Sequence, residues 1–211
     1  VLHAQPPFAA GNARLINISA RNFVGTDADI LIAGFNLTGF GTRRILLRAV
    51  GPTLGGVPFL VPGVLADPKL TLFDGAGTKV AENDNWGGTP QLSSTFFSVG
   101  AFPLTATSRD AVLLVTLAPG SYTAQISGVN ATTGVALVEV YEIGSTGAKL
   151  LNTSTRLQIS ATSAPIIGMV VAPGVGTRKL LVRTAGPALG AFGLSGTLED
   201  PSIRITNTKN E

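Results

Sequence analysis

The residues that could carry chemistry in this chain are few, and their spacing argues against catalysis. The only histidine, His3, lies in a Pro-, Ala- and Gly-rich opening segment, so a Ser-His-Asp arrangement has no general base. Cysteine is absent, which excludes a thiolate nucleophile and a zinc–sulfur site. The 12 acidic residues could supply a glycosidase pair, but most stand in turn-forming sequences. We therefore expect no enzyme activity and no cofactor.

Two arginines and two aspartates recur at matching places along the chain. Arg48 and Asp67 have counterparts in Arg183 and Asp200. Because Arg48 follows an apolar strand sequence, its charge must be paired if it is buried. We predict two structural ion pairs, Arg48 with Asp67 and Arg183 with Asp200, which pin the Gly-Pro loops that follow each strand. A ligand contact at these arginines is the alternative.

The densest polar patch is the sequence Glu82–Trp86. Calcium prefers oxygen ligands of this kind, and Asp74, Asn83 and Asp84 are the metal candidates. The spacing of a calcium loop is absent, however, and Asx turns use the same residues, so we favour turn capping and predict no metal. Trp86, the only tryptophan, is the candidate for stacking on a sugar ring, although its neighbours favour an apolar plug at the sandwich edge.

Composition limits the partners of the chain. The net charge is only +3, and the basic cluster formed by Arg43, Arg44 and Arg48 has no interleaved aromatic residues, so nucleic acid is not an expected partner. No apolar run reaches the roughly 18 to 20 residues of a membrane helix, so no membrane span is expected.

The elements that must position these residues are strands. The chain has 26 glycines and 13 prolines, and its apolar residues stand in short runs separated by turn sequences. We find no convincing amphipathic helix and predict an all-β fold, a β-sandwich of the jelly-roll type. The predicted strands are 14–20, 30–37, 44–50, 69–73, 78–82, 110–117, 121–127 and 135–141.

The second organising feature is a long internal repeat. Gly41–Gly55 and Gly176–Gly190 are identical at 9 of 15 positions, and the flanking sequences match as well. A period of this length is one domain-sized module. The second copy is predicted to have strands at 150–158, 165–171, 179–184 and 202–206, with no helix within 176–206. The predicted organisation is a lead-in (1–13), a complete module (14–143), a flexible linker (144–149) and a partial second module (150–211).

Four sequence segments resemble a known type of module. They are Asp67–Gly75, Ala81–Trp86, Leu117–Thr123 and Val138–Tyr141. Together they resemble a tandem β-sandwich module of large secreted bacterial proteins and are similar to the pre-peptidase C-terminal type. The resemblance implies an extracellular accessory, adhesive or structural module.

The partial second copy suggests a function. Its predicted strands carry more apolar side chains than a lone half-module can cover, and natural proteins cover such faces and edges. We expect an extracellular or cell-surface bacterial structural protein. Its partner would be itself, in a head-to-tail filament or surface assembly completed by strand exchange. The alternative is a carbohydrate-binding or adhesive module of a longer secreted tandem-repeat protein, with polysaccharide as its partner.

Overall fold

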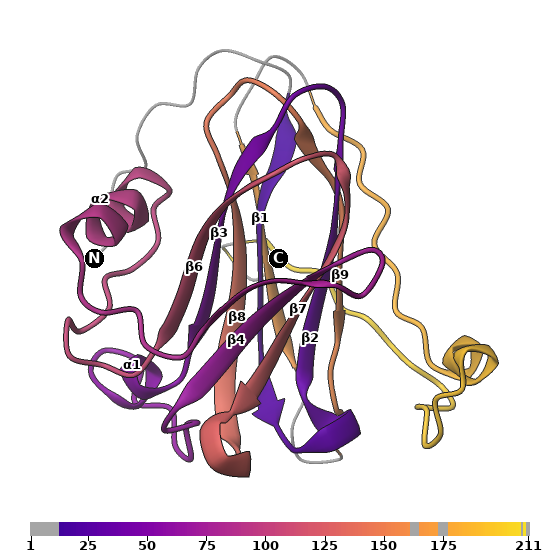
Figure 1. Cartoon of the computed structure of the whole chain (residues 1–211). Coiled ribbons are helices and arrows are strands. Elements are labelled where there is room, and N and C mark those ends of the chain that lie inside the picture. The colour runs from indigo at the N-terminus through magenta and orange to yellow at the C-terminus, as the bar shows by residue number, and fades with distance from the viewer. Residues whose placement is uncertain (1–12, 161–164, 173–176, 208, 210–211) are drawn as a thin grey trace. The chain divides into compact units, whose positions relative to one another are not determined.

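The computed structural model describes residues 13–160, 165–172, 177–207 and 209. Two antiparallel five-stranded sheets enclose one apolar core, which confirms the predicted all-β sandwich (Figure 1). The strands are β1 (Arg14–Val24), β2 (Leu31–Thr38), β3 (Arg43–Val50), β4 (Pro68–Asp74), β5 (Lys79–Asn83), β6 (Ala111–Leu117), β7 (Gly120–Gly128), β8 (Gly134–Ile143), β9 (Lys149–Arg156) and β10 (Ile166–Ala172). The first sheet has the order β10-β1-β8-β3-β6, and the second has the order β5-β4-β7-β2-β9.

The eight strands predicted for the first copy are all present, because alternation of apolar residues sets their buried face. On β2, for example, Ala33 and Phe35 lie in the core between the sheets. The central strand β3 is buried on both faces: Ile45 belongs to the core between the sheets, whereas Leu46 belongs to a second apolar cluster. This second cluster lies on the outer face of the first sheet.

Helical segments cover that outer face. They are the short α1 (Pro52–Gly55) and α2 (Pro90–Ser98), which we did not predict. Thr89 caps α2 by accepting a hydrogen bond from the backbone N–H of Leu92, and Pro90 stands in its first turn. Phe96 is buried from α2 and packs against Trp86 with ring centroids 5.5 Å apart. The 3₁₀ turns are η1 (Asp27–Asp29), η2 (Val129–Ala131) and η3 (Pro187–Phe192).

The second copy is divided between two compact units. Its first two strands, β9 and β10, belong to the same unit as the first copy, and the boundary falls between residues 176 and 177. The division of the chain therefore differs from the flexible linker expected at 144–149. The strands predicted at 179–184 and 202–206 were wrong, because the structure has no strand within 177–207. The lead-in 1–13, including His3, lies outside the described residues apart from Ala13.

The unit formed by residues 177–211 nevertheless repeats the local conformation of the first copy. Gly51 has φ −123° and ψ −73° before α1, and its counterpart Gly186 has φ −120° and ψ −82° before η3. A Cβ on Gly51 would lie 2.1 Å from the Leu65 carbonyl oxygen, and a Cβ on Gly186 would lie 1.9 Å from that of Leu198. The helical turn thus conflicts with the prediction of no helix in 176–206, but it is itself part of the repeat.

Candidate functional site

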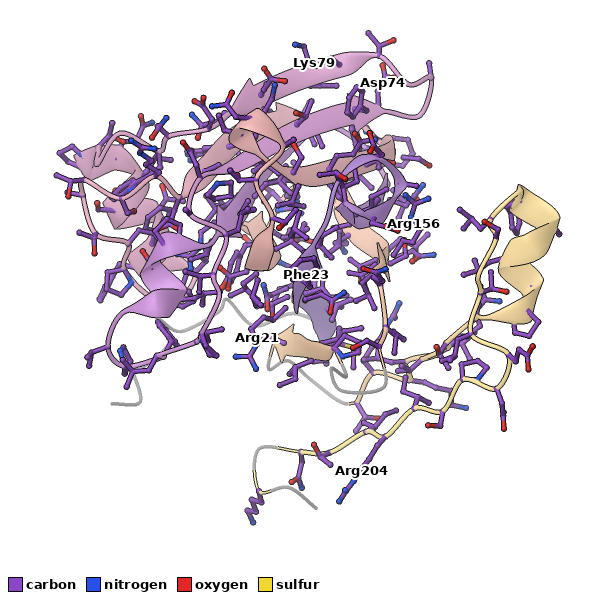
Figure 2. All side chains as sticks on the ribbon, turned by 90° about the horizontal axis from the view of Figure 1, so that it is seen from below. Arg21, Phe23, Asp74, Lys79, Arg156 and Arg204 are labelled. Carbon is purple, nitrogen blue, oxygen red and sulfur yellow. The ribbon has the colours of Figure 1, made fainter. Side chains whose placement is uncertain are left out.

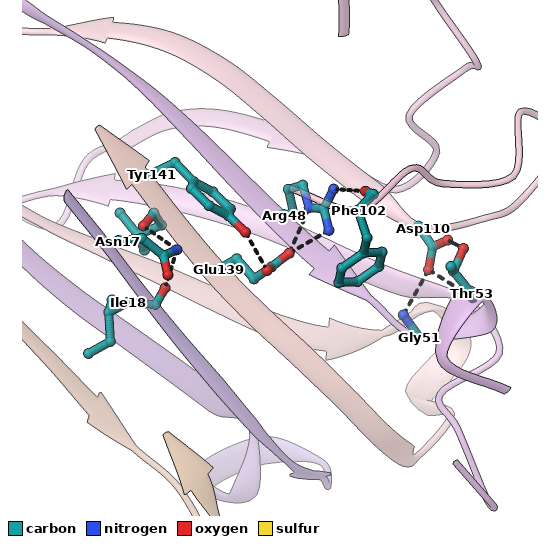
Figure 3. Close-up of polar contacts among 10 residues, drawn as sticks. Asn17, Ile18, Arg48, Gly51, Thr53, Phe102, Asp110, Glu139 and Tyr141 are labelled. Atoms are coloured by element: carbon teal, nitrogen blue, oxygen red, sulfur yellow. Dashed lines mark hydrogen bonds and ion pairs between the residues drawn. The ribbon is translucent and has the colours of Figure 1, made fainter. Parts of the chain in front are cut away.

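A buried charged cluster lies on the outer face of the first sheet, where Arg48 packs against Phe96 of α2. Figure 3 shows its polar contacts. The pairing of β3 with β8 sets Arg48 opposite Glu139. Nε and Nη2 of Arg48 both lie 2.7 Å from Oε2 of Glu139, and Nη1 donates a 2.6 Å hydrogen bond to the Phe102 carbonyl oxygen. The Tyr141 hydroxyl donates to Oε1 of Glu139 at 2.7 Å.

Aromatic rings close this cluster from solvent. The guanidinium carbon of Arg48 lies 4.3 Å from the Phe102 ring centroid and 4.9 Å from that of Phe96, within the range of cation–π attraction. Arg48 is fully buried and Glu139 is 4 % exposed. Burial, followed by the charge of Glu139, raises the pKa of Tyr141 above its ordinary value. Nε and Nη1 of Arg48 donate hydrogen bonds and Nη2 lies within ion-pair distance of Glu139, so the guanidinium ties β8 to the aromatic cover, and we assign the cluster a structural role.

The pairing predicted between Arg48 and Asp67 was therefore wrong. Asp67 instead pairs with Arg109 at 3.1 Å, and the Arg109 side chain is 66 % exposed. Sequence reasoning matched the two residues because both recur, but cross-strand register decides which carboxylate faces Arg48. Glu139 carried a usable signal, since it stands between two apolar residues on a strand and so needs a partner of its own.

The Gly-Pro loop is pinned by Asp110, which sequence reasoning missed. This carboxylate is fully buried and accepts hydrogen bonds from the backbone N–H of Gly51 at 2.8 Å and from the hydroxyl of Ser108 at 2.7 Å. The Thr53 hydroxyl also donates to it. An aspartate that immediately precedes an apolar strand was the available signal.

The second predicted ion pair does not form a buried site. Arg183 and Asp200 are both exposed within the unit 177–211, and among the described residues no ion pair joins them. Their first-copy counterparts meet other partners on β8 and near β6, and the described part of the second copy has no such strands.

The predicted sugar-stacking residue is an apolar plug. Trp86 is 4 % exposed, and its indole N–H donates to the Thr105 carbonyl oxygen and to the Ser108 hydroxyl, both at 3.1 Å. Its ring packs against Phe96, so neither face is free to stack on a sugar.

The three metal candidates accept backbone hydrogen bonds or are exposed to solvent. Asp74 accepts hydrogen bonds from the backbone N–H groups of Ala76 and Thr78, and Figure 2 shows it on the β4–β5 hairpin with Lys79. Asn83 accepts from the backbone N–H of Val112, while Asp84 is exposed. Within the described residues no group of three or more histidine, cysteine or acidic side chains could hold a metal ion.

The connection between the two copies is held by a second charged cluster. Arg43 is 1 % exposed and donates to the carbonyl oxygens of Ile143, Gly147 and Ala148. Glu142 lies 3.3 Å from Arg43 and 2.9 Å from Arg14. Burial lowers the pKa of Arg43, and the nearby Glu142 opposes that shift. Glu142 also accepts from the backbone N–H of Leu150 at 2.8 Å, so the segment expected to be a flexible linker is tied to the sandwich.

Beyond this connection the second copy pairs directly with the first, and we call this contact the seam. In the first sheet β10 pairs with β1, and in the second sheet β9 pairs with β2. By the repeat, β9 is the counterpart of β1 and β10 is the counterpart of β2. Figure 2 labels one such matched pair, Arg21 on β1 and Arg156 on β9. Each sheet thus joins a β1-type strand to a β2-type strand.

The register of the seam is the same in both sheets once β10 is aligned with β2 at an offset of 134 residues, one fewer than the offset of 135 that relates β9 to β1. Arg21 lies opposite Ile166 in one sheet, and its counterpart Arg156 lies opposite Ile32 in the other. Both pairings also shift at one place, which leaves Ile16 and its counterpart Leu151 without an opposing residue. The seam therefore has an internal pseudo-two-fold symmetry, as an isologous interface between two identical modules would have.

Two glycines show how close the strands come at the seam. A Cβ on Gly34 would lie 2.7 Å from the hydroxyl oxygen of Ser154, and a Cβ on Gly168 would lie 2.7 Å from that of Ser19. Ser154 is the second-copy counterpart of Ser19 in the repeat, and Gly168 takes the place of Gly34 in the seam register. The same glycine–serine contact is thus made twice, once in each sheet.

Beyond the seam, the end of the sandwich formed by β9 and β10 is open. Ile167 and Met169 lie opposite the core residues Ala20 and Ile18, so their side chains share the inner face of the first sheet. They are 46 % and 39 % exposed. Their counterparts on β2, Ala33 and Phe35, are 1 % and 4 % exposed. The second copy therefore begins a core that the described residues leave uncovered.

No protein-family model, curated protein or solved structure matches the chain. None of the described helices is long and apolar enough to cross a membrane. The seam and the open end are the features of the molecule from which we infer a function.

Proposed function

We propose that the chain is a structural protein of an extracellular or cell-surface assembly, built from β-sandwich modules joined by shared sheets. One observation carries the proposal: β9 and β10 of the second copy extend both sheets of the first copy in matched register. Such a joint resists bending because two layers of backbone hydrogen bonds cross it, whereas a flexible linker would let modules move independently.

The charged clusters support a structural role as well. Glu142 ties the connecting segment to Arg14 and Arg43, and Glu139 ties β8 to the cover through Arg48. Both carboxylates and all three arginines therefore take part in contacts within the protein. The extracellular location rests on the resemblance of the sequence motifs alone.

The proposed partner is another copy of the module. The seam joins like ends of two modules and is isologous, so a contact of this kind closes on itself. A head-to-tail filament would need a further contact through another surface of the sandwich, and it remains a prediction.

Assembly of the full chain tests the proposal. Sedimentation velocity and negative-stain electron microscopy should show species above the 21.5 kDa of one chain, growing as the protein concentration rises. Because the chain has no cysteine, Ser19→Cys/Gly168→Cys should form a seam disulfide without loss of assembly. A chain that stays monomeric at high concentration, with β9 and β10 protected from amide exchange, would refute the proposal.

A further inference from the structure

We propose that the open end formed by β9 and β10 binds a strand pair of the β7–β8 type, that is, a segment with the sequence of residues 120–143. The inference deepens the structural role proposed above and rests on it. In the first copy β8 lies beside β1 and β7 lies beside β2. Since β9 and β10 are the counterparts of β1 and β2, each has one edge in the seam and one edge that no strand of the described residues occupies.

The repeat also fixes the register of the incoming strands. Ile18 lies opposite Val140 in the first copy, so Thr153, the counterpart of Ile18, should lie opposite an incoming Val140. Phe35 lies opposite Tyr122, so Met169, which takes the place of Phe35 in the seam register, should lie opposite an incoming Tyr122. Both incoming strands belong to one continuous segment, Gly120–Ile143, and a single segment can therefore complete both sheets.

The incoming strands would supply the missing apolar layer. Ala124 and Ile126 of β7 and Val138 and Val140 of β8 are at most 1 % exposed in the first copy and belong to its core. The same side chains next to β9 and β10 would cover the inner face that carries Ile167. Covering this face is the gain that drives binding.

Charge complementarity points to the same occupant. Glu142 of β8 pairs with Arg14 and Arg43, and Glu139 pairs with Arg48. The second-copy counterparts of these three cations are all exposed; they are Lys149, Arg178 and Arg183. An incoming β8 would bring the two carboxylates that match them.

The far edges of the incoming strands explain why residues 177–207 form no strand. In the first copy β3 pairs with β8, and β4 pairs with β7. The counterparts of β3 and β4 fall near 178–185 and 201–207, where Leu181 is 87 % exposed and Ile205 is 61 % exposed. Their first-copy counterparts, Leu46 and Leu72, are fully buried. These segments lack the strands against which they would order.

Binding of a synthetic peptide to the full chain tests the inference. A fluorescein-labelled peptide of residues 120–143 should bind saturably with one peptide per chain, as measured by fluorescence anisotropy, and a scrambled peptide should not bind. Ile167→Asp should weaken binding by about tenfold or more, because it places a charge on the inner face. Ile166→Asp is the matched control, since the adjacent isoleucine points to the opposite face, and it should leave the affinity within about threefold of the parent.

A cysteine trap tests the register. Thr153→Cys in the full chain should form a disulfide with a peptide carrying Val140→Cys in preference to one carrying Val138→Cys. Amide exchange should slow in 179–185 and 201–207 when the peptide is bound. Equal binding by the scrambled peptide, parental affinity in Ile167→Asp, or no preference between the two cysteine peptides would each overturn the inference. If the peptide fails while the seam disulfide and assembly persist, only this inference falls and the structural role stands.

Discussion

Replacing Arg48 with alanine is the sharpest test of the buried cluster. The substitution removes both contacts to Oε2 of Glu139, the hydrogen bond to the Phe102 carbonyl oxygen and the cation–π contacts with Phe96 and Phe102. It leaves the Glu139 carboxylate 4 % exposed, with the Tyr141 hydroxyl as its remaining hydrogen-bond donor in the cluster.

The expected loss follows from the stranded carboxylate. Removing one partner of a buried ion pair costs about 3 to 5 kcal/mol, and the unpaired Phe102 carbonyl adds to that cost. The hydrogen bond from Tyr141 offsets part of the loss, so we expect about 4 kcal/mol in the free energy of unfolding. A domain of this kind is stable by about 5 to 15 kcal/mol, so the variant should fold but unfold at much lower urea concentration.

Urea unfolding followed by Trp86 fluorescence measures the change, because Trp86 lies in the same apolar cluster. Arg44→Ala is the matched control: the residue lies on the same strand but is exposed, and its loss should cost less than about 0.5 kcal/mol. Arg48→Met/Glu139→Leu should be less destabilised than Arg48→Ala, since no buried charge is left unpaired. A stability of Arg48→Ala close to that of Arg44→Ala would refute the reasoning.

Three further predictions test other parts of the molecule. Asp110→Asn should lower the free energy of unfolding by about 2 to 3 kcal/mol, whereas Asp67→Asn should cost less than about 1 kcal/mol because its partner Arg109 is largely exposed; equal urea midpoints would contradict this. The raised pKa of Tyr141 gives stability that is fully present below the unfolded pKa of about 10 and is lost as pH rises above it, so the advantage of the parent over Tyr141→Phe should shrink in alkaline urea titrations. Gly168→Val should disrupt the seam at Ser19 and speed amide exchange in β10, while leaving β3 protected; unchanged exchange in β10 would show that the strands are not in contact.

The fold of the first copy could be predicted because its determinants are local. Alternation in β2 and β7 and the turn sequences between strands specify which residues extend and which face is buried. The helix α2 was missed although Leu92, Phe96 and Val99 recur at helical spacing, because the helix has only nine residues and the serines and threonine within it have low helix propensity. Two of the four strands predicted for the second copy are absent. The sequence pattern could not show this, because a segment becomes a strand only when a neighbouring strand pairs with its backbone.

That Arg48 forms a buried ion pair could be predicted from the sequence, but the carboxylate with which it pairs could not. An arginine after an apolar run requires a carboxylate, and Arg48 has one. Which carboxylate it meets depends on the register between β3 and β8, a contact across 91 residues of sequence. Recurrence of Arg48 with Asp67 was a misleading guide, because both residues recur for separate reasons: one pairs on β8 and the other pairs with Arg109.

The order of strands in the sandwich explains why the second copy attaches where it does. Within the first copy, β1 and β2 are edge strands of the two sheets at the same end, and they are also the first strands that a following copy presents. Edge strands expose unpaired backbone N–H and C=O groups. Antiparallel pairing of β1 with β10 and of β2 with β9 gives hydrogen-bond partners to the edges of both sheets. The glycine opposite each serine permits the close approach, and the shared bulge keeps the two registers matched. The seam lies within one chain and uses these two edges, so in the proposed assembly we expect growth through completion of the second module rather than through the seam itself.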